Sequence, residues 1–332
     1  MPMIHFLNVN DGDCSIVQHG NGNVSVFDVC NAEALKTAAA MRMAQFTEQA
    51  ATAARAAPRG NFRQKDYPVN PIQYMKDHGI TSVFRFILTH PDMDHMDGMK
   101  AFFDALSPIN FWDTDNTKEM DDFDTGRYKE EDWLFYKSMR DGNGENPKRL
   151  VKYSGATGQY WNQDENKNSG GNGLYILAPT AELVAAANEA DDFNDCSYVF
   201  LYKTYSRRIL FSGDSHDATW EHILLNHKAD VTKIDLLIAP HHGRASGRDY
   251  GFLDVVKPKM TYFGNAKHEH LAYDAWNNRK LPFITNNQAN CIVCEIDDNS
   301  MSQYVTNKSY AEAVNSDTFY SERHRAYYIG DI

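Results

Sequence analysis

The sequence predicts an α+β protein in which layered β-sheets are flanked by helices. Short apolar runs separated by tight turns open the chain at residues 3–9, 14–18 and 24–29, and this spacing is typical of a meandering sheet. Further along, strand-like runs alternate with helical segments. This order favours layered sheets over a doubly wound parallel sheet.

Helices and strands after the first three runs are indicated by composition and periodicity. Residues 32–57 are rich in Ala, Met, Gln and Glu without Gly or Pro, and Pro71 and Gly79 mark the start and stop of a short helix. We expect helices at 32–57, 71–78, 96–106, 128–139, 219–227 and 271–279, and strands at 83–88, 174–177, 197–205, 207–212, 234–239, 260–263, 282–285 and 291–296.

The polar region 113–172 is predicted to be an insertion or long edge segment of a domain covering residues 1–299. The polar and aromatic tail 300–332 is expected to pack on that domain or on a partner. Aromatic residues at the insertion can either stack on bases or pack on the core, and packing is favoured. They are Trp112, Trp133, Tyr136, Tyr160 and Trp161.

Charge and length restrict the function. The 332 residues include 33 Lys and Arg against 45 Asp and Glu, a net charge of −12. This charge argues against a protein that binds nucleic acid through a broad basic surface. It is compatible with an enzyme for phosphates, because a bound divalent metal can supply the local positive charge. We find no membrane-spanning run and no signal peptide, so we expect a cytoplasmic protein.

Five cysteines without a secretion signal suggest reduced thiols. Cys291-Ile-Val-Cys294 has the spacing of a redox or zinc pair, but it falls in a strand-like run and has no second pair. Burial in the core is therefore the favoured interpretation of both residues.

The strongest chemical signal is the run Thr89-His-Pro-Asp-Met-Asp-His-Met-Asp-Gly98, directly after an apolar strand. His90, Asp92, Asp94 and His95 are four potential ligands within six residues. Alternate side chains of such a loop can converge, so one loop could supply ligands to two metal ions.

Other strands also end in ligand-type residues. Asp214 follows a buried strand and a Gly, where a carboxylate can bridge two cations, and His241-His242-Gly follows another strand. His268-Glu-His270 follows a third, with metal binding and an ordinary loop equally favoured. Arg244 and Arg248 lie where they could contact a phosphate at the mouth of the site.

Together these motifs resemble the metallo-β-lactamase fold, and more closely its branch that includes the nuclease domain of the DNA-uptake competence channel protein. The resemblance covers roughly residues 3–297 and implies a four-layer αβ/βα sandwich with a metal site at one edge. Besides the ligand motifs, it rests on Gly12-Asp13 after the first strand, Val26-Phe-Asp28, Asn194-Asp-Cys-Ser197, Gly264-Asn265 and His270.

The resemblance implies a centre with two divalent ions. The implied ligands are His90 and Asp92 for the first ion, Asp94, His95 and His242 (or its neighbour His241) for the second, and Asp214 as the bridge. Asp28 and Asp94 would orient a water or accept its proton. The remaining imidazole, taken as His241, would contact the substrate or donate a proton, and His270 would line the substrate site.

Two departures from the wider fold bear on the metals. Asp92 stands where the fold has His, and oxygen-richer sites suit Mn²⁺ or Mg²⁺ better, with Zn²⁺ still a candidate. A further His ligand expected before Asp214 is missing. The first ion is therefore expected to be weakly held, filled only with substrate, or absent.

The expected function is a metal-dependent phosphodiesterase or nuclease in which a metal-activated water attacks a small or single-stranded phosphate substrate. Hydrolysis of a thioester, lactone or β-lactam on the same fold is one alternative. A non-catalytic binding module with a degraded metal site, acting through a protein partner or as a homo-oligomer, is the other.

Overall fold

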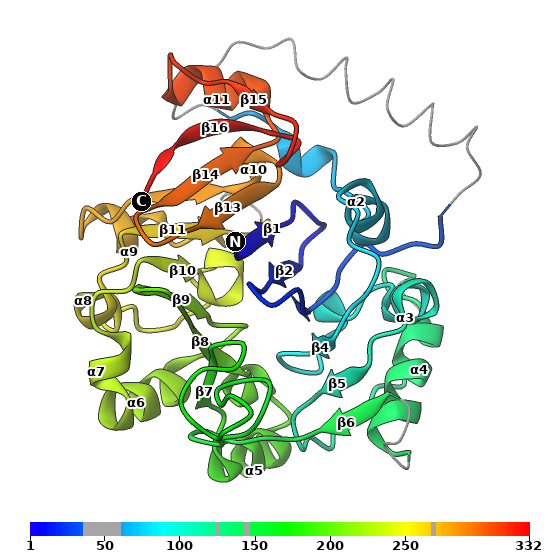
Figure 1. Cartoon of the computed structure of the whole chain (residues 1–332). Helices are drawn as coiled ribbons and strands as arrows, with labels where there is room; N and C mark the ends of the chain where they lie inside the picture. The colour runs from blue at the N-terminus through cyan, green and yellow to red at the C-terminus, as the bar shows by residue number, and fades with distance from the viewer. Residues whose placement is uncertain (36–60, 124–125, 143–146, 267–269) are drawn as a thin grey trace.

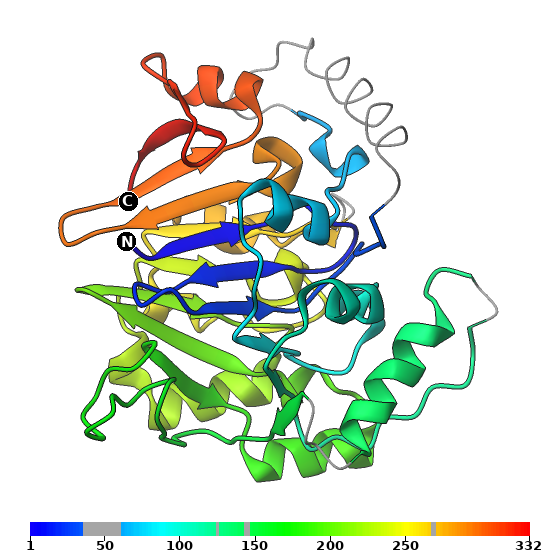
Figure 2. The same ribbon diagram turned by 45° about the vertical axis from the view of Figure 1, so that its right-hand side comes forward.

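The computed structural model describes residues 1–35, 61–123, 126–142, 147–266 and 270–332. Most of the predicted helix 32–57, and both His268 and Glu269, lie outside these ranges. The described residues form two mixed sheets with helices on their outer faces (Figures 1 and 2).

The first sheet has the strand order β15-β16-β14-β13-β1-β2-β3-β4-β5-β6. Pairing is antiparallel from β15 to β3 and parallel from β3 to β6. Its strands are β1 (Met3–Phe6), β2 (Ser15–Gln18), β3 (Val24–Phe27), β4 (Arg85–Ile87), β5 (Asn110–Trp112), β6 (Lys148–Leu150), β13 (Ile292–Ile296), β14 (Met301–Val305), β15 (Tyr320–Ser321) and β16 (Ala326–Asp331).

The second sheet has the order β12-β11-β10-β9-β8-β7. Its strands β9 to β12 are parallel, while β7, β8 and β9 pair antiparallel. They span β7 (Leu174–Ala178), β8 (Val199–Thr204), β9 (Arg207–Phe211), β10 (Leu236–Ile238), β11 (Met260–Phe263) and β12 (Phe283–Thr285).

Helices cover the outer faces of both sheets. On the first sheet they are α2 (Pro71–Asp77), α3 (Met99–Leu106) and α4 (Glu130–Arg140), and on the second α6 (Asp217–Asn226), α8 (Leu253–Val256) and α9 (Tyr273–Asn277). The shorter α7 (Lys228–Val231) and α10 (Asn286–Ala289), together with α5 (Ala181–Ala190) and α11 (Lys308–Val314), complete the α-helices of the described ranges.

The main core lies between the sheets. Phe27 of β3 and Phe211 of β9 stack across it with ring centroids 4.4 Å apart, and both rings are buried. Alternation along the strands sends the neighbouring residues outward, so Val26 packs under the helices of the first sheet and Leu210 under those of the second. Burial of strands on both faces is what gives them continuous apolar sequences.

The predicted strands are all confirmed, and so are the predicted helices that fall within the described ranges, with ends shifted by a few residues. The region 113–172 contains α4 and the edge strand β6, and Asp132 of α4 accepts hydrogen bonds from the backbone N–H groups of Gly98 and Lys100 at the start of α3. The tail 300–332 extends the first sheet through β14, β16 and β15.

The packing interpretation holds for four of the five aromatic residues, whereas Tyr160 keeps 58% of its surface exposed. Trp112, Trp133 and Tyr136 are buried, and Trp112 meets Trp161 edge to face. All five cysteines are free and buried, including Cys291 and Cys294. A search of the described helices found none with the length and apolar character needed to span a membrane.

Candidate metal centre

The potential ligands stand at the ends of strands from both sheets. After β4, the loop carrying His90 runs into a short 3-10 helix, η2 (Met93–His95), and after β10 a second one, η4 (Pro240–Gly243), carries the histidine pair. Backbone hydrogen bonds join these ends, from Tyr198 N to Thr89 O at 2.9 Å and from His241 N to Gly213 O at 3.0 Å. Residues far apart in sequence are thereby brought to one edge.

Asp28, just after β3, holds His95 in place from behind. Its Oδ2 accepts a hydrogen bond from Nδ1 of His95 at 2.9 Å, and its two oxygens accept from the backbone N–H and the hydroxyl of Thr89, each at 2.7 Å. The same hydroxyl lies 3.1 Å from Nδ1 of His90. Both imidazoles are fully buried, and their Nε2 atoms face away from Asp28 and Thr89.

Asp13 is the ion-pair partner of His242, with its Oδ1 3.0 Å from Nδ1 of the ring but without the geometry of a hydrogen bond. Space for this contact depends on Gly264, where a Cβ atom would stand 2.8 Å from the same oxygen. His241 and His242 both have positive φ, at 51° and 57°, so the segment is held in a strained conformation of the kind found at functional sites.

Asp214 is the point on which the imidazoles converge. The Nε2 of His95 lies 3.2 Å from its Oδ1, and the Nε2 atoms of His90 and His242 each lie 3.8 Å from its Oδ2. Asp94 approaches from the open side, 3.6 Å from Nε2 of His242. Among the described residues, three triads of ligand atoms lie within 4.8 Å of one another: His90–His95–Asp214, Asp94–His95–His242 and Asp13–Asp214–His242.

The donor set fits a divalent cation. The Nε2 atoms of His90, His95 and His242 and the Oδ1 of Asp214 are buried, yet they form no hydrogen bond within the described chain. Such atoms are costly to bury unless something else satisfies them. Imidazoles whose second nitrogen contacts a carboxylate or hydroxyl are also the usual arrangement of metal-ligating histidines.

Electrostatics of the cluster follow from the same contacts. Burial opposes the charged forms, but the carboxylates of Asp214 and Asp28 raise the pKa of His95 well above its ordinary value. Asp13 and Asp214 likewise raise the pKa of His242 to about 10 against the effect of burial. Because only unprotonated imidazoles bind metal, cation binding at this cluster must release protons.

His241 differs from its neighbour. Its Nδ1 accepts a hydrogen bond from the buried guanidinium of Arg248 at 2.8 Å, and its Nε2 lies 3.5 Å from Oδ2 of Asp214. Burial, together with the charges of His242, Arg248 and Arg244, lowers the pKa of His241 to about 4 although Asp214 acts in the opposite direction. A guanidinium can only donate, so the single hydrogen of the neutral ring is on Nε2.

Three other residues predicted for the site are Asp92, Arg244 and His270. Oδ2 of Asp92 is 3.5 Å from Nε2 of His90, while its other oxygen pairs with Lys118. Arg244 is half-buried and its Nε has no hydrogen-bond partner in the described ranges. His270 is exposed, and its carbonyl accepts a hydrogen bond from the backbone N–H of Ala245 at 2.7 Å.

Three residues of the centre are not predicted as site residues by the sequence. Asp13 stands in the Gly-Asp turn after the first strand, which indicates its position but not its role. Thr89 directly precedes the loop of candidate ligands. In metal sites a neighbouring polar residue usually contacts the ring nitrogen of a histidine that does not bind the metal. Lys118 has no local signal, because it lies in a polar segment 26 residues from Asp92.

Comparison with known proteins finds similarity among solved structures only. No family model and no curated protein matches the sequence. Solved structures of similar chain arrangement include a protein from Parabacteroides distasonis described as a metal-dependent hydrolase (TM-score 0.40, 11% identity, 86% of this chain and 93% of that chain covered). Others are a diphosphatase of the PhnP family (0.39, 13%, 85% and 94%) and unliganded yeast PDE1 (0.39, 10%, 86% and 98%). We therefore derive the function from the geometry of the site.

Proposed function

We propose that this protein is a metal-dependent hydrolase of the metallo-β-lactamase fold, a four-layer αβ/βα sandwich, and that it cleaves phosphate esters as a phosphodiesterase or nuclease. The observation that carries the proposal is the convergence of three buried imidazoles on Asp214, with their Nε2 atoms free of hydrogen bonds in the described chain.

In this proposal Asp94, His95, His242 and Asp214 hold a divalent cation, with His90 as a further donor beside Asp214 and with Zn²⁺, Mn²⁺ and Mg²⁺ as candidates. Such a cation supplies a water of lowered pKa as nucleophile and a positive charge for the oxygens of the substrate. Asp28 keeps His95 in the tautomer that leaves Nε2 free, and Asp13 stands at Nδ1 of His242 as its ion-pair partner. Since both oxygens of Asp28 are engaged and it is 2% exposed, we assign it a positioning role instead of contact with water.

His241 is proposed to act on the substrate. The hydrogen bond from Arg248 leaves the proton of the ring on Nε2, which lies beside Asp214 at the centre, so His241 can donate to a substrate oxygen or a leaving group. An Nε2–H group cannot bind metal, which supports His242 as the ligand of the pair. Arg248 acts through His241, and Arg244 is a candidate contact for a phosphate oxygen.

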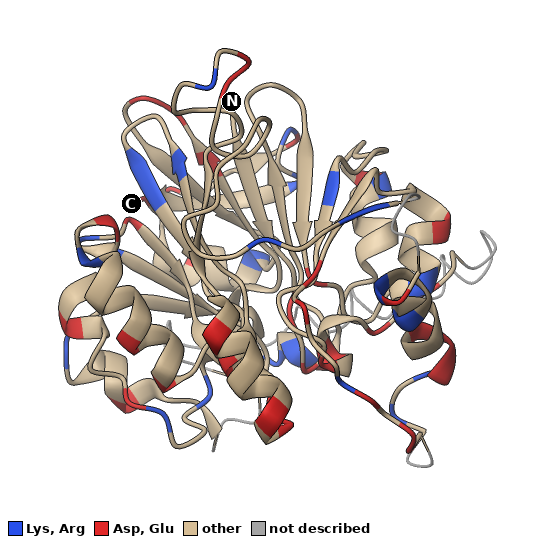
Figure 3. Cartoon of the chain, turned by 90° about the horizontal axis from the view of Figure 1, so that it is seen from below, with Lys and Arg blue, Asp and Glu red and all other residues tan. Residues whose placement is uncertain are grey.

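A small or single-stranded phosphate substrate suits the surface. The net charge is −12, and in the view of Figure 3 basic residues are interspersed with acidic ones over many elements. A long duplex would meet this surface with unfavourable charge. The binding of a small substrate at the cation itself depends much less on the charge of the remaining surface.

The test is hydrolysis of bis-p-nitrophenyl phosphate by the purified protein with Mn²⁺, Mg²⁺ or Zn²⁺, beside a thioester, a lactone and a β-lactam. We expect turnover of the phosphodiester, and losses of about 10³-fold or more for His95→Ala and Asp214→Ala. His222→Ala, which removes an imidazole outside the centre, is the matched control. Preferential turnover of a carbonyl substrate would replace the proposed reaction, and metal binding without any turnover would favour a binding module.

A further inference from the structure

We propose that the ammonium group of Lys118 takes the place of a second metal ion, so that one divalent cation and one lysine together hold the phosphate group. This inference rests on the proposed function, because it concerns the same centre. It differs from the sequence-based expectation of two ions and names the group that replaces one of them.

Lys118 lies against the carboxylate that the sequence assigns to the first ion. Its Nζ forms an ion pair with Oδ1 of Asp92 and lies 5.2 Å from the centroid of the buried Phe193 ring. The side chains of Lys118 and Asp92 keep 20% and 32% of their surface exposed. The ammonium is therefore held from two sides, at the end of a side chain that is not completely buried.

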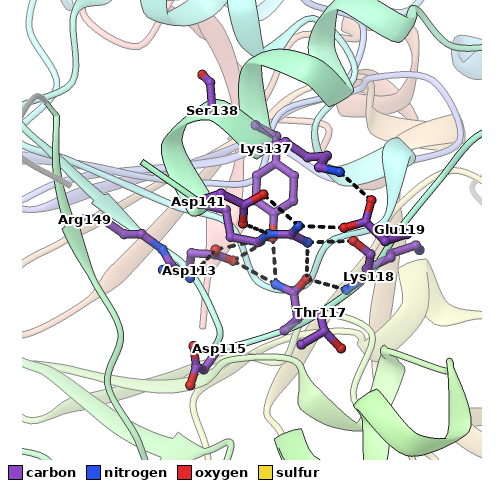
Figure 4. Close-up of polar contacts among 12 residues, drawn as sticks. Asp113, Asp115, Thr117, Lys118, Glu119, Lys137, Ser138, Asp141 and Arg149 are labelled. Atoms are coloured by element: carbon purple, nitrogen blue, oxygen red, sulfur yellow. Dashed lines mark hydrogen bonds and ion pairs between the residues drawn. The ribbon is translucent and has the colours of Figure 1, made fainter. Parts of the chain in front are cut away.

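A buried polar network fixes the segment that carries Lys118 (Figure 4). The backbone N–H of Lys118 donates to Asn116 Oδ1 at 3.3 Å, and its carbonyl accepts from Arg140 Nη1 at 2.6 Å. Asn116 and Arg140 are themselves 5% and 7% exposed. The neighbouring N–H of Thr117 donates to Asn188 at 2.9 Å. The position of the lysine thus follows from interior contacts, unlike that of a loose surface side chain.

The three triads of ligand atoms overlap at His95, His242 and Asp214, and one of them includes His90. Each triad among the described residues contains His95 or His242, and none contains Asp92. Asp92 has one oxygen in the pair with Lys118 and the other 3.5 Å from His90. Asp214 Oδ2 lies 3.8 Å from the same His90 nitrogen, but no ligand atom in the described ranges forms with Asp92 and His90 a triad within 4.8 Å. A second ion would have to displace the lysine and would find an incomplete ligand set.

The chemistry of lysine suits this substitution. An ammonium is a compact positive charge with three N–H donors, and it binds phosphate as a point charge. A phosphate oxygen bound beside Asp94 and Asp214 would leave other oxygens for Lys118. The ammonium is part of the chain, so its charge is always present at the site. The charge of a second metal ion would instead depend on the concentration of free metal in solution.

Metal stoichiometry tests the inference independently of turnover. The full-length protein is saturated with Zn²⁺ or Mn²⁺, freed of excess metal and analysed by elemental mass spectrometry. We expect one equivalent per chain, unchanged in Asp92→Asn because Asp92 is not a ligand. Two equivalents, or loss of the ion in Asp92→Asn, would overturn the inference. No bound metal at all would overturn the proposed function as well.

Binding of inorganic phosphate to the Zn²⁺-loaded protein tests the role of the lysine by calorimetry. Lys118→Met should keep one equivalent of metal and weaken phosphate binding about ten- to a hundredfold, while Lys118→Arg stays within a few-fold. Lys100→Met is the control, since Lys100 pairs with Asp104 on the exposed side of α3. Equal phosphate affinity in Lys118→Met and the control would refute the proposed role of Lys118 in phosphate binding.

Discussion

Replacement of Asp28 by asparagine tests how the carboxylate behind His95 controls the orientation of that ring. The carboxylate accepts three hydrogen bonds: from Thr89 N at one oxygen, and from Thr89 Oγ1 and His95 Nδ1 at the other. Its φ of 57° lies in the left-handed region, which asparagine tolerates better than most residues. Asp28→Asn therefore changes the hydrogen-bond chemistry while sparing the backbone.

Either orientation of the new amide places an NH₂ group against a buried donor. A donor left unsatisfied costs about 1–3 kcal/mol of stability. If the NH₂ faces Nδ1 of His95, the ring must move its hydrogen to Nε2 to avoid the clash, which blocks the ligand atom. Loss of such a partner typically weakens metal binding about 10–100-fold, or about 1.4–2.8 kcal/mol.

Zn²⁺ affinity is measured by competition with a chromogenic chelator and stability by urea denaturation of the metal-free protein. Asp104→Asn, on the exposed side of α3, is the control and should change neither quantity. An Asp28→Asn protein that is folded and binds Zn²⁺ as tightly as wild type would refute both the positioning role of Asp28 and the ligand role of His95 Nε2.

Other changes have outcomes that follow from single contacts. Burial, aided by Arg85, lowers the pKa of His19 from 6.5 to about 3, so the unfolded chain takes up the proton first as the pH falls. His19 should thus cost about 1.4 kcal/mol of stability per pH unit between about pH 6.5 and 3, and the pH dependence of the urea midpoint should be shallower in His19→Gln. Gly98 has a φ of 84° and a Cβ would lie 1.8 Å from the carbonyl oxygen of Ala32, so Gly98→Ala should cost more than about 3 kcal/mol in urea denaturation. Gly22→Ala, with a φ of 89° and open space, should cost only about 1 kcal/mol, and equal costs would contradict the steric argument. Zn²⁺ at about 100 times its Kd should add about 2.7 kcal/mol to the free energy of unfolding, a gain that chelation or His95→Ala removes; a wild-type melting temperature indifferent to metal would contradict it.

Strand positions were predictable because both faces of most strands are buried. The run 209–211 is apolar throughout and 83–88 is interrupted only by the buried Arg85, and the candidate ligands Asp214 and His90 follow a few residues beyond them. The strands that were not predicted include β14, which is mostly buried but mixes polar and apolar residues, and β6 at the edge of its sheet. Lys148-Arg-Leu150 is a three-residue edge strand with no fully buried side chain, identifiable only through its pairing with β5.

The candidate ligands could be identified for the same local reason, whereas the residues that contact them could not. Whether Asp28 touches water or holds His95 depends on the packing of β3 beside β4, which fixes both of its oxygens. The choice between His241 and His242 depends on Arg248, seven residues from His241, and on Asp13, which comes from a distant part of the chain. Such contacts are set by tertiary structure and cannot be deduced from the spacing of residues in the sequence.

The acidic charge of the chain has a local counterpart at the centre. Five carboxylates gather there, and three of them already have a partner: Asp13 with His242, Asp28 with His95, and Asp92 with Lys118. Asp94 and Asp214 remain beside Nε2 atoms that lack hydrogen bonds in the described chain. The two negative charges of Asp94 and Asp214 equal the charge of one divalent cation. A second cation would also need the carboxylate of Asp92, whose charge Lys118 already balances. The pairing of the carboxylates thus leads to the same count of ions as the grouping of the ligands.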